Sequence, residues 1–340
     1  MSISVLNPGL LTTIQDSGRY GYQKNGIVVS GAMDIYDMKL ANIAVGNDEN
    51  EGVLEVTMIG PSLKLSKGEL ISITGANISP VINKKKVPMG RPVYIKKDST
   101  LEFGTNLNGC RAYIAVCGGF DIKPVMGSVS TYLRGKLGGI EGRTLKKGDI
   151  LKIKPKTLMG NKLIKKLSTS LDRVYDKAEF CAPRWYIKNY ADYEKNNSKE
   201  QVIRVFEDMQ YKGFSEKSLE KFWNSPFLVD SKSDRMGYRL KGEEITMNEK
   251  IEMISGEVSF GTIQIPPDGN PIILLADRAT AGGYPKIAHV CDYDIHKLVQ
   301  LKPGDHIRFE KIDIKEAERL YIERLKEIDE LKKSVELVSY

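Results

Sequence analysis

Cysteine, histidine and long apolar runs are all scarce in this chain of 340 residues. Its four cysteines form no Cys-x-x-Cys pair and its three histidines lack metal-ligand spacing, which argues against a zinc site and a disulfide framework. No apolar run approaches the ~20 residues that span a bilayer. Met1–Leu11 also lacks the basic segment and long apolar stretch of a signal peptide. We therefore expect a cytoplasmic protein with no metal centre and no membrane association.

The common catalytic and nucleotide-binding motifs are also missing. The sequence has no G-x-x-x-x-G-K-[ST] phosphate loop, no G-x-G-x-x-G turn, no H-E-x-x-H and no G-x-S-x-G elbow. If this protein binds ATP, it must use a fold other than the common nucleotide-binding folds that carry these motifs. The net charge of +7 comes from scattered lysines. The one short run, Lys84–Lys86, is interpreted as an exposed hairpin tip, so we expect no nucleic-acid partner.

What the chain does contain is a series of short β-patterned segments separated by Gly, Pro, Asn and Asp. Many short strands with frequent turns predict an all-β, or mainly β, fold built from barrels or sandwiches. The predicted strands are Glu69–Thr74, Val93–Ile95, Thr100–Phe103, Arg111–Val116, Ile150–Ile153, Ile251–Ile254, Ile272–Leu275 and His306–Phe309.

Two sequence echoes indicate an internal duplication. Phe103–Thr105 (FGT) recurs at Phe260–Thr262, and Leu145–Asp149 (LKKGD) recurs as Leu301–Asp305 (LKPGD). The two matches share nearly the same offset. One echo can arise by chance, but two in register favour a duplicated β unit.

Three stretches are predicted to be helical. Asp34–Val45 has Asp34 as its N-cap, and Ser215–Trp223 is capped by Ser215. Asp313–Leu337 is a long amphipathic helix that we expect to pack on its own chain. Its predicted apolar stripe is Ala317, Tyr321, Leu325, Ile328 and Val335.

These patterns divide the chain into four parts. The first half covers residues 1–155 and the second covers residues 201–312. A polar, lysine-rich connecting segment over 156–200 joins them, and the C-terminal helix takes 313–340.

Clusters of Gly, hydroxyl, Arg and Asp residues are the candidate sites. In the first, Thr12–Gly21, a tight turn can aim the guanidinium of Arg19, with Asp16 to orient it or a substrate amide. A hairpin loop closed by an Asp–Arg pair explains the same residues equally well. The second cluster, Ser30–Asp34, leaves backbone N–H groups free before a helix, which suits an anion or an ordinary N-cap.

The third cluster combines a glycine pair, Gly118 and Gly119, with the hydroxyls of Ser128, Ser130 and Thr131. Glycines directly after an apolar strand permit close approach of the backbone to a ligand. Three hydroxyls can bind an oxyanion or a phosphate. A bulge followed by a polar loop is the structural alternative.

In the fourth cluster, Ser233–Arg239, the side chains of Arg235 and Arg239 can form a clamp on a carboxylate or phosphate, with Asp234 beside them. A surface ion pair, which stabilises a fold little, is the alternative.

The fifth cluster covers Gly261–Gly269 and Asp277–Lys286. Asp277 closes an apolar strand, where a buried carboxylate needs a partner. The loop after it suits phosphate or amide groups, although Gly-Gly-Tyr-Pro is also an ordinary turn. The members taken as ligand-binding are Gln264, Thr280, Gly282, Gly283 and Lys286.

Together these segments closely resemble the family of allophanate hydrolase subunit 2 and the 5-oxoprolinase C subunit. That family also contains the antagonist of the sporulation-kinase inhibitor and a subdomain of urea carboxylase. The matching segments run through nearly the whole chain in the family's order. They are Gly9–Gly21, Ser30–Asn47, Glu55–Pro61, Gly118–Thr131, Gly142–Asp149, Ser233–Leu240, Gly261–Gly269 and Ala276–Lys286.

The resemblance implies two cyclophilin-like β-barrel domains and a protein that works only in a complex. Its partners would be the B subunit of 5-oxoprolinase, a homologue of the kinase inhibitor, and the A subunit of the same enzyme. The assembled enzyme would open the lactam ring of 5-oxoproline to glutamate with hydrolysis of ATP, which carries Mg as its counter-ion.

Roles for the clusters follow as expectations from this resemblance. Asp277, Arg235 and Asp16 are the expected catalytic residues, with either carboxylate as base or orienter. Arg19, Arg235, Arg239 and Lys286 would hold charged groups. The pairs Gly118-Gly119 and Gly282-Gly283 would donate backbone N–H groups to developing oxyanions.

Two other functions stay open. One is a carboxyltransferase that moves a carboxyl group from carboxybiotin to urea or a similar amide. The other is a non-catalytic regulator that binds a kinase-inhibitor homologue, since one fold serves several functions. The chain departs from the family soon after the strand that opens its second half, where Gly-Pro-Gln is usual and Arg204–Gln210 (RVFEDMQ) stands instead. His296 also replaces a commoner Pro. The first change could alter a ligand-facing loop.

Overall fold

The computed structural model describes residues 1–169, 173–188, 200–249 and 253–339. The chain forms two compact units. Unit 1 comprises Met1–Arg19, Asp34–Glu194 and Lys326–Tyr340, and unit 2 comprises Tyr20–Met33 and Lys195–Leu325. Over the described ranges, no helix combines the length and apolar character required to cross a membrane.

Unit 1 contains two sheets, counted over its described residues. The six-stranded sheet has the order β11 (Ile150–Lys152), β1 (Ser2–Asn7), β4 (Ser62–Leu65), β9 (Ser99–Phe103), β6 (Pro80–Ile82) and β7 (Lys85–Lys86). The seven-stranded sheet has the order β12 (Arg173–Asp176), β13 (Phe180–Pro183), β8 (Val93–Ile95), β5 (Leu70–Asn77), β10 (Asn108–Val116), β3 (Val53–Thr57) and β2 (Leu11–Gln15).

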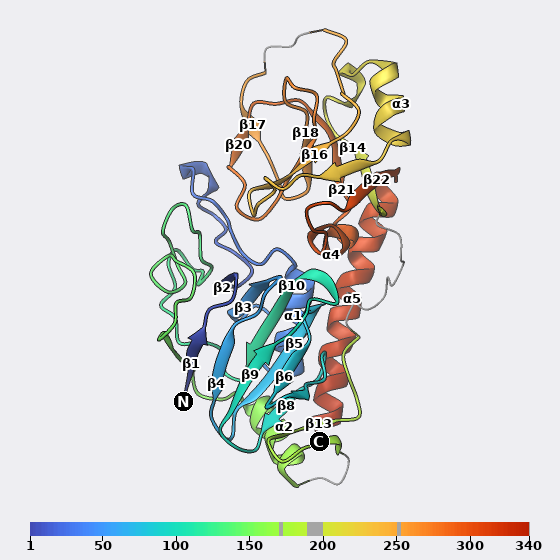
Figure 1. The fold of residues 1–340 in the computed structure, drawn as a ribbon. Coiled ribbons are helices and arrows are strands. Elements are labelled where there is room, and N and C mark those ends of the chain that lie inside the picture. Colours follow the sequence, from blue (N-terminus) through green and yellow to red (C-terminus); the bar gives the residue numbers. More distant parts are fainter. Residues whose placement is uncertain (170–172, 189–199, 250–252, 340) are drawn as a thin grey trace. The chain divides into compact units, whose positions relative to one another are not determined.

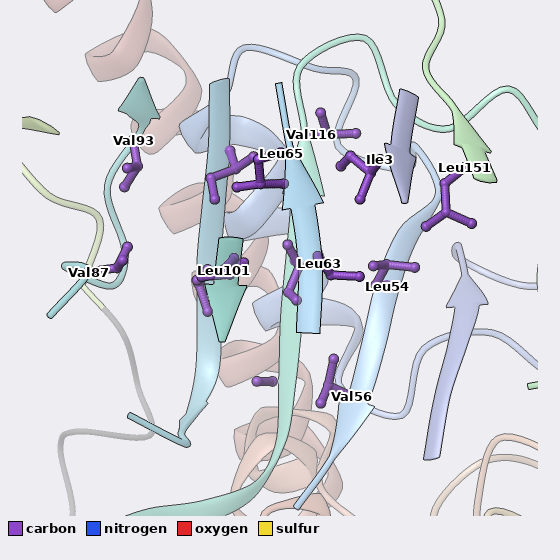
Figure 2. Close-up of a cluster of buried hydrophobic side chains, with 14 of the residues drawn as sticks. Ile3, Leu54, Val56, Leu63, Leu65, Val87, Val93, Leu101, Val116 and Leu151 are labelled. Atoms are coloured by element: carbon purple, nitrogen blue, oxygen red, sulfur yellow. The ribbon is translucent and has the colours of Figure 1, made fainter. Parts of the chain in front are cut away.

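The apolar residues of these strands meet in one core. Figure 2 shows Leu63 and Leu101 of the six-stranded sheet lying beside Leu54 and Val116 of the seven-stranded sheet. Strands β5 and β10 are buried along nearly their whole length, because helix α1 (Ile35–Ala44) packs on them as well. A strand covered on both faces loses the polar–apolar alternation of a half-exposed strand.

Local sequence signals set the ends of two helices as predicted. The Asp34 side chain accepts a hydrogen bond from the backbone N–H of Asp37 at the start of α1. The Ser215 side chain does the same for Ser218 at the start of α3 (Glu216–Asn224). Each cap satisfies a backbone donor that has no partner inside the helix.

The strands of unit 2 close into a barrel, again over the described residues. Its order is β14 (Glu200–Glu207), β21 (Lys286–Val290), β18 (Thr262–Gln264), β19 (Ile272–Leu274), β16 (Gly237–Lys241), β15 (Phe227–Val229) and β22 (His306–Lys311). Parallel pairing of β14 with β22 completes the ring. A separate ribbon pairs β17 (Gly256–Glu257) with β20 (Ala281–Gly282), and α4 (Ile295–Val299) follows β21 (Figure 1).

One of the two sequence echoes corresponds to a repeated structure. The turns Leu145–Asp149 and Leu301–Asp305 each contain a glycine with φ above 90°, and each leads to the next strand. The glycine N–H donates to a strand carbonyl in both, to Val5 at 2.8 Å and to Val229 at 3.0 Å. The FGT echo differs, because its first copy ends β9 whereas its second leads into β18. The Gly-Asp turn therefore carries the evidence for duplication.

The C-terminal helix α5 (Ile314–Ser339) is present, but the predicted apolar stripe is wrong at two positions. Tyr321 and Leu325 are 46% and 44% exposed. The predicted and the buried positions both follow the 3.6-residue period, so periodicity alone does not choose between them. The buried positions are Ala317, Leu320, Arg324, Ile328 and Val335. Arg324 can take a buried position because its guanidinium lies 4.0 Å from the centre of the Tyr293 ring.

The remaining expectations differ from the structure at a few places. The segment 156–200 contains helix α2 (Leu158–Thr169) and strands β12 and β13, and Tyr20–Met33 belongs to unit 2.

Two further sequence predictions concern short segments. As predicted, Lys84–Lys86 lies in a hairpin, formed by β6 and β7, where Asn83 and Lys84 both have positive φ. The predicted strand Ile251–Ile254 falls partly outside the described residues, and its last two residues are not in a strand.

Candidate functional site

Three of the candidate clusters converge on one buried ion pair in unit 2. The Arg235 guanidinium donates to both carboxylate oxygens of Asp277, with Nε–Oδ2 at 3.0 Å and Nη2–Oδ1 at 3.2 Å. The Ser30 hydroxyl donates to Asp277 Oδ1 at 2.7 Å, and Arg235 Nη2 donates to the carbonyl of Gly31 at 2.5 Å. Ser30, Arg235 and Asp277 are each at most 6% exposed.

The backbone fixes this arrangement as firmly as the side chains do. The N–H of Asp277 donates to the carbonyl of Arg235 at 2.8 Å, which holds the two residues side by side. Ser30 and Gly31 both have positive φ, 58° and 95°. For a non-glycine residue such as Ser30 this conformation is uncommon, and it is often found at functional sites.

This cluster can hold the charged Arg235 guanidinium in a fixed orientation. Both oxygens of Asp277 already accept hydrogen bonds within the chain, so proton abstraction by this carboxylate would require the ion pair to break first. A bidentate pair holds a guanidinium in a fixed plane. The geometry thus favours Asp277 as the residue that positions Arg235.

A second cluster of buried polar side chains lies in unit 1 around Asp16. Its Oδ1 accepts from the Ser128 hydroxyl at 2.6 Å, the Ser130 hydroxyl at 2.5 Å and the N–H of Gly18 at 2.8 Å. Its Oδ2 accepts from the N–H of Val129 at 2.7 Å. Through these four hydrogen bonds, the Asp16 carboxylate links the turn after β2 to the loop of residues 128–131.

Arg19 belongs to the same cluster. It is fully buried, and its Nη2 donates to the carbonyl of Ser130. Gly138 lies directly against both groups, because a Cβ there would be 2.7 Å from Arg19 Nη2 and 2.0 Å from the Ser130 oxygen. Gln15 donates to the carbonyl of Thr131 at 3.1 Å. The structure therefore joins the first and third clusters through Asp16, Ser128, Ser130 and Thr131.

The expected oxyanion donors Gly118 and Gly119 need a correction. Their N–H groups already donate inside the chain, to Asn47 Oδ1 at 2.7 Å and to the Val116 carbonyl at 2.9 Å. A Cβ at Gly118 would lie 2.6 Å from the Pro155 carbonyl oxygen. These glycines permit positive φ and close packing of the chain on itself, which is the structural alternative stated above.

Arg239 does not join Arg235 in a shared clamp. It is exposed on β16 and lines a surface hollow of about 140 Å³ together with Asp230, Lys241 and Asp268. Arg235 is buried beside Asp277 instead. The two arginines are only four residues apart, but one lies at the surface and the other is buried. The predicted clamp of Arg235 and Arg239 on one ligand is therefore wrong.

The remaining members of the fifth cluster gather beside the β17–β20 ribbon. Gln264 Nε2 donates to the Tyr284 carbonyl at 3.1 Å, and a Cβ on Gly282 would lie 2.6 Å from the same nitrogen. Lys286 Nζ donates to the Glu257 carbonyl at 2.5 Å. Gly282 pairs with Gly256 across the ribbon.

Two more members of this loop, Thr280 and Gly283, lie close by. The Thr280 carbonyl accepts from the N–H of Val258 at 3.4 Å, and a Cβ on Gly283 would lie 3.3 Å from the Ser255 hydroxyl. Gln210 ends the segment that departs from the family, and its side chain accepts a hydrogen bond from the Lys286 N–H at 3.1 Å. The Gln210 amide therefore orients this strand.

An open hollow of about 750 Å³ lies on unit 2 where the sequence departs from the family. Glu207, Asp208 and Met209 line it, together with His289. Burial lowers the pKa of His289, Asp292 and Asp208 oppose this shift, and Arg278 adds to it. A neutral imidazole in an open hollow can accept or donate a hydrogen bond. Sequence reasoning missed His289 because a single histidine inside a strand carries no motif.

No group of three or more His, Cys, Asp or Glu residues suited to a metal ion occurs within the described parts of the chain. The Asp16 and Asp277 clusters lie in different units. Each is built by segments that are distant in sequence, and in each the carboxylate accepts hydrogen bonds at both of its oxygens.

One unit with a closed barrel, one unit with two sheets and a long C-terminal helix make this a mainly β protein. The chain belongs to the family described as "Carboxyltransferase domain, subdomain A and B", which it matches over residues 25–311.

Two kinds of relative are similar to it. The 5-oxoprolinase C subunit of Haemophilus influenzae is 33% identical over 334 residues, which cover 98% of this chain and 99% of that protein. The urea amidolyase of Saccharomyces cerevisiae is 32% identical over 91% of this chain but only 16% of its own length.

Solved structures agree with the second kind. The Kluyveromyces lactis urea carboxylase superposes with a TM-score of 0.83 at 30% identity, covering 97% of this chain and 29% of that one. The K. lactis urea amidolyase gives 0.82 at 29% identity, over 97% of this chain and 20% of that one. The chain thus corresponds to a fifth to a third of those proteins.

Proposed function

We propose that this chain is the C subunit of an ATP-dependent 5-oxoprolinase and acts in a complex with the A and B subunits of that enzyme. One observation carries the proposal. The match to the Haemophilus C subunit extends over nearly the full length of both proteins, whereas the urea amidolyase match covers a small part of a larger chain. A shared fold alone would not choose between these functions.

The chemistry calls for an activated amide. The lactam of 5-oxoproline is stable, so its oxygen would first attack the γ-phosphorus of ATP and release ADP. Water would then add to the activated carbon, and cleavage of the C–N bond would release the ring nitrogen as the amine and leave an acyl phosphate. A second water would hydrolyse this acyl phosphate to glutamate and phosphate. Such a sequence needs groups that hold anionic oxygens in fixed positions.

Arg235 is our candidate for holding one of these anionic groups. Asp277 and Ser30 fix the plane and position of its guanidinium through the contacts given above. In the other unit, Arg19 donates to the carbonyl of Ser130, and Asp16 holds Ser130 by accepting from its hydroxyl. We assign both carboxylates a positioning part and not that of a base, because each already accepts several hydrogen bonds.

ATP is a substrate of the whole complex in this proposal. The hollow on unit 2 is lined by the carboxylates of Glu207 and Asp208 and by the ammonium of Lys212, so its lining offers a triphosphate no excess of positive charge. Lys286 donates to a backbone carbonyl and Arg235 is paired with Asp277. We infer that other subunits supply most of the charge that binds ATP and its Mg counter-ion.

The alternative is a carboxyltransferase that acts on urea or a related amide. The similarity to urea amidolyase and urea carboxylase favours it. Carboxybiotin would arrive on a separate carrier, and a hollow of about 750 Å³ is within the usual size of ligand pockets. A regulator that binds a kinase-inhibitor homologue without turnover is the third candidate.

The deciding experiment is co-expression with the A and B subunits. We expect 5-oxoproline-dependent release of phosphate from ATP that disappears when this chain is omitted. Activity on urea that requires a biotinylated carrier and is blocked by avidin would establish the alternative. A tight complex that turns over neither substrate would leave only the regulator.

A further inference from the structure

A second hollow, of about 300 Å³, lies in unit 1, away from every residue considered above. Its apolar floor comes from Leu163 and Leu167 of α2, Trp185 after β13 and Val338 of α5. This volume is at the lower end of the range for small-molecule pockets. The floor can bury a short hydrocarbon chain or one ring.

The charge around this floor has one sign. Lys166, Arg173 and Arg184 line the hollow, and none of its lining residues, all within the described ranges, is an Asp or Glu. Three cations around an apolar floor favour an amphipathic anion.

Hydrogen bonds within the chain use only some of the donors of these cationic side chains. Lys166 Nζ donates to the Val338 carbonyl at 2.7 Å, and Arg173 Nη2 donates to the Ser168 carbonyl at 2.5 Å. Both are contacts with the last turn of a helix, where cations are favourable. Arg173 Nη1 also lies 3.4 Å from Oδ2 of Asp176, which is outside the hollow. An ammonium has three donors and a guanidinium five, so each side chain retains further donors.

One of those donors is left unsatisfied. Within the described residues, Arg173 Nε is buried and has no hydrogen-bond partner. A buried N–H without a partner costs free energy. Because this nitrogen is closed off from solvent, it does not face the open hollow, and the attraction for an anion comes from the charge of Arg173 together with that of Lys166 and Arg184.

Arg91 fixes the backbone of the segment that carries Arg184 and Trp185. Arg91 Nη1 donates to the carbonyls of Pro183 at 2.8 Å and Trp185 at 3.0 Å, and also to that of Arg184. Its guanidinium lies 4.8 Å from the centre of the Tyr186 ring. Because one side chain binds three successive carbonyls, this side of the hollow is held in a defined position.

We propose that this hollow binds a small amphipathic carboxylate, with the carboxylate on Arg173 and Arg184 and the apolar part on Leu163, Leu167 and Trp185. The site does not depend on the proposed enzymatic function. It lies wholly within unit 1, so it can be tested on the full chain by itself.

Tryptophan fluorescence provides a direct test, because the chain has only two tryptophans, Trp185 and Trp223. In a Trp223→Phe background, titration with hexanoate should give a saturable change in Trp185 emission. Hexylammonium, which has the same chain and the opposite charge, should give none. An equal response to hexylammonium would overturn the proposal, as would the absence of any saturable response to hexanoate.

Substitutions locate the effect. Arg184→Gln and Arg173→Gln should each weaken hexanoate binding about tenfold, as expected for loss of a charge-assisted hydrogen bond. Arg184 is exposed, so its variant remains informative should Arg173→Gln fail to fold. Lys165→Gln is the control, since it also removes one positive charge, from an exposed residue of α2 that does not line the hollow. Equal weakening by Lys165→Gln would show that only general charge attraction is at work.

Discussion

Arg235 and Asp277, 42 residues apart, form a bidentate ion pair that is closed off from solvent and completed by Ser30. The sequence suggested that each charged residue belonged to a site. It did not show that they neutralise each other, and this changes what their substitution should do.

Removal of one member of this pair should destabilise the protein. Arg235→Ala or Asp277→Ala leaves a buried charge without its partner, for which we expect a loss of about 3–5 kcal/mol in the free energy of unfolding. Urea denaturation of each variant measures this loss. The double variant Arg235→Met/Asp277→Leu should lose less than the worse single variant, because no lone charge remains. Single variants as stable as the parent would show that the pair is not buried in solution.

Because alanine at either position is expected to destabilise the fold, such variants do not separate a role in the reaction from a role in stability. A gentler change separates the two effects. Ser30→Ala removes one hydrogen bond to Asp277 and should cost about 1 kcal/mol. In the assembled complex we expect kcat to fall about tenfold, since a freer guanidinium no longer meets the developing charge in one position.

The control for that measurement is Ser233→Ala, which removes a hydroxyl bonded to the Arg239 backbone in the same unit. It should leave kcat within twofold. If Ser30→Ala proves as active as Ser233→Ala in the complex, Arg235 has no part in the reaction that depends on its orientation.

Gly138 provides a test of the Asp16 cluster. Gly138→Ala would place a methyl group 2.0 Å from the Ser130 carbonyl oxygen at a φ of 65°. We expect a loss of more than about 3 kcal/mol and a displaced Arg19, because steric overlap adds to backbone strain.

Gly127→Ala is the matched control for Gly138. Its φ is 77° and a Cβ there would meet nothing within 4 Å, so only the strain of about 1–2 kcal/mol remains. Thermal denaturation of both variants gives the comparison. Equal losses would mean that the close contact at Gly138 is relieved by a small shift.

The sequence predicted local features well and long-range ones poorly. Asp34 and Ser215 cap their helices because an N-cap depends on the next three residues only. The stripe on α5 failed at Tyr321 and Leu325, since Arg324 is held by the Tyr293 ring and not by its own helix. Gly118 and Gly119 showed the correct turn, but not that the Gly118 N–H donates to Asn47, which is 71 residues away in the chain.

The convergence of Ser30 with Asp277 could not be predicted at all. These residues are 247 positions apart, and Tyr20–Met33 belongs to the unit formed by the second half of the chain. Nothing in the composition of that segment assigns it to either half. Motif reasoning marked both places as sites, and only the fold shows that they are the same site.

Glu69 should make stability depend on pH. It is 1% exposed, and burial raises its pKa to about 7, opposed by the hydrogen bond from the Ser66 N–H and by the charges of the N-terminus and Lys156. Within the described residues its Oε1 has no hydrogen-bond partner. In the unfolded chain Glu69 titrates near its ordinary value of 4.5. Between these two values the folded protein holds a proton that the unfolded chain has lost.

The Glu69 contribution is therefore complete below about pH 4.5 and disappears as the pH rises through about 7, with a size on the order of 3 kcal/mol. Glu69→Gln keeps an acceptor for the Ser66 N–H but cannot ionise. Urea denaturation from pH 5 to pH 8 should show the parent losing stability relative to this variant as the pH rises. Glu102→Gln, a change at an exposed carboxylate of β9, should follow the parent. Parallel curves for the parent and Glu69→Gln would mean that Glu69 is already ionised in the folded protein at pH 5.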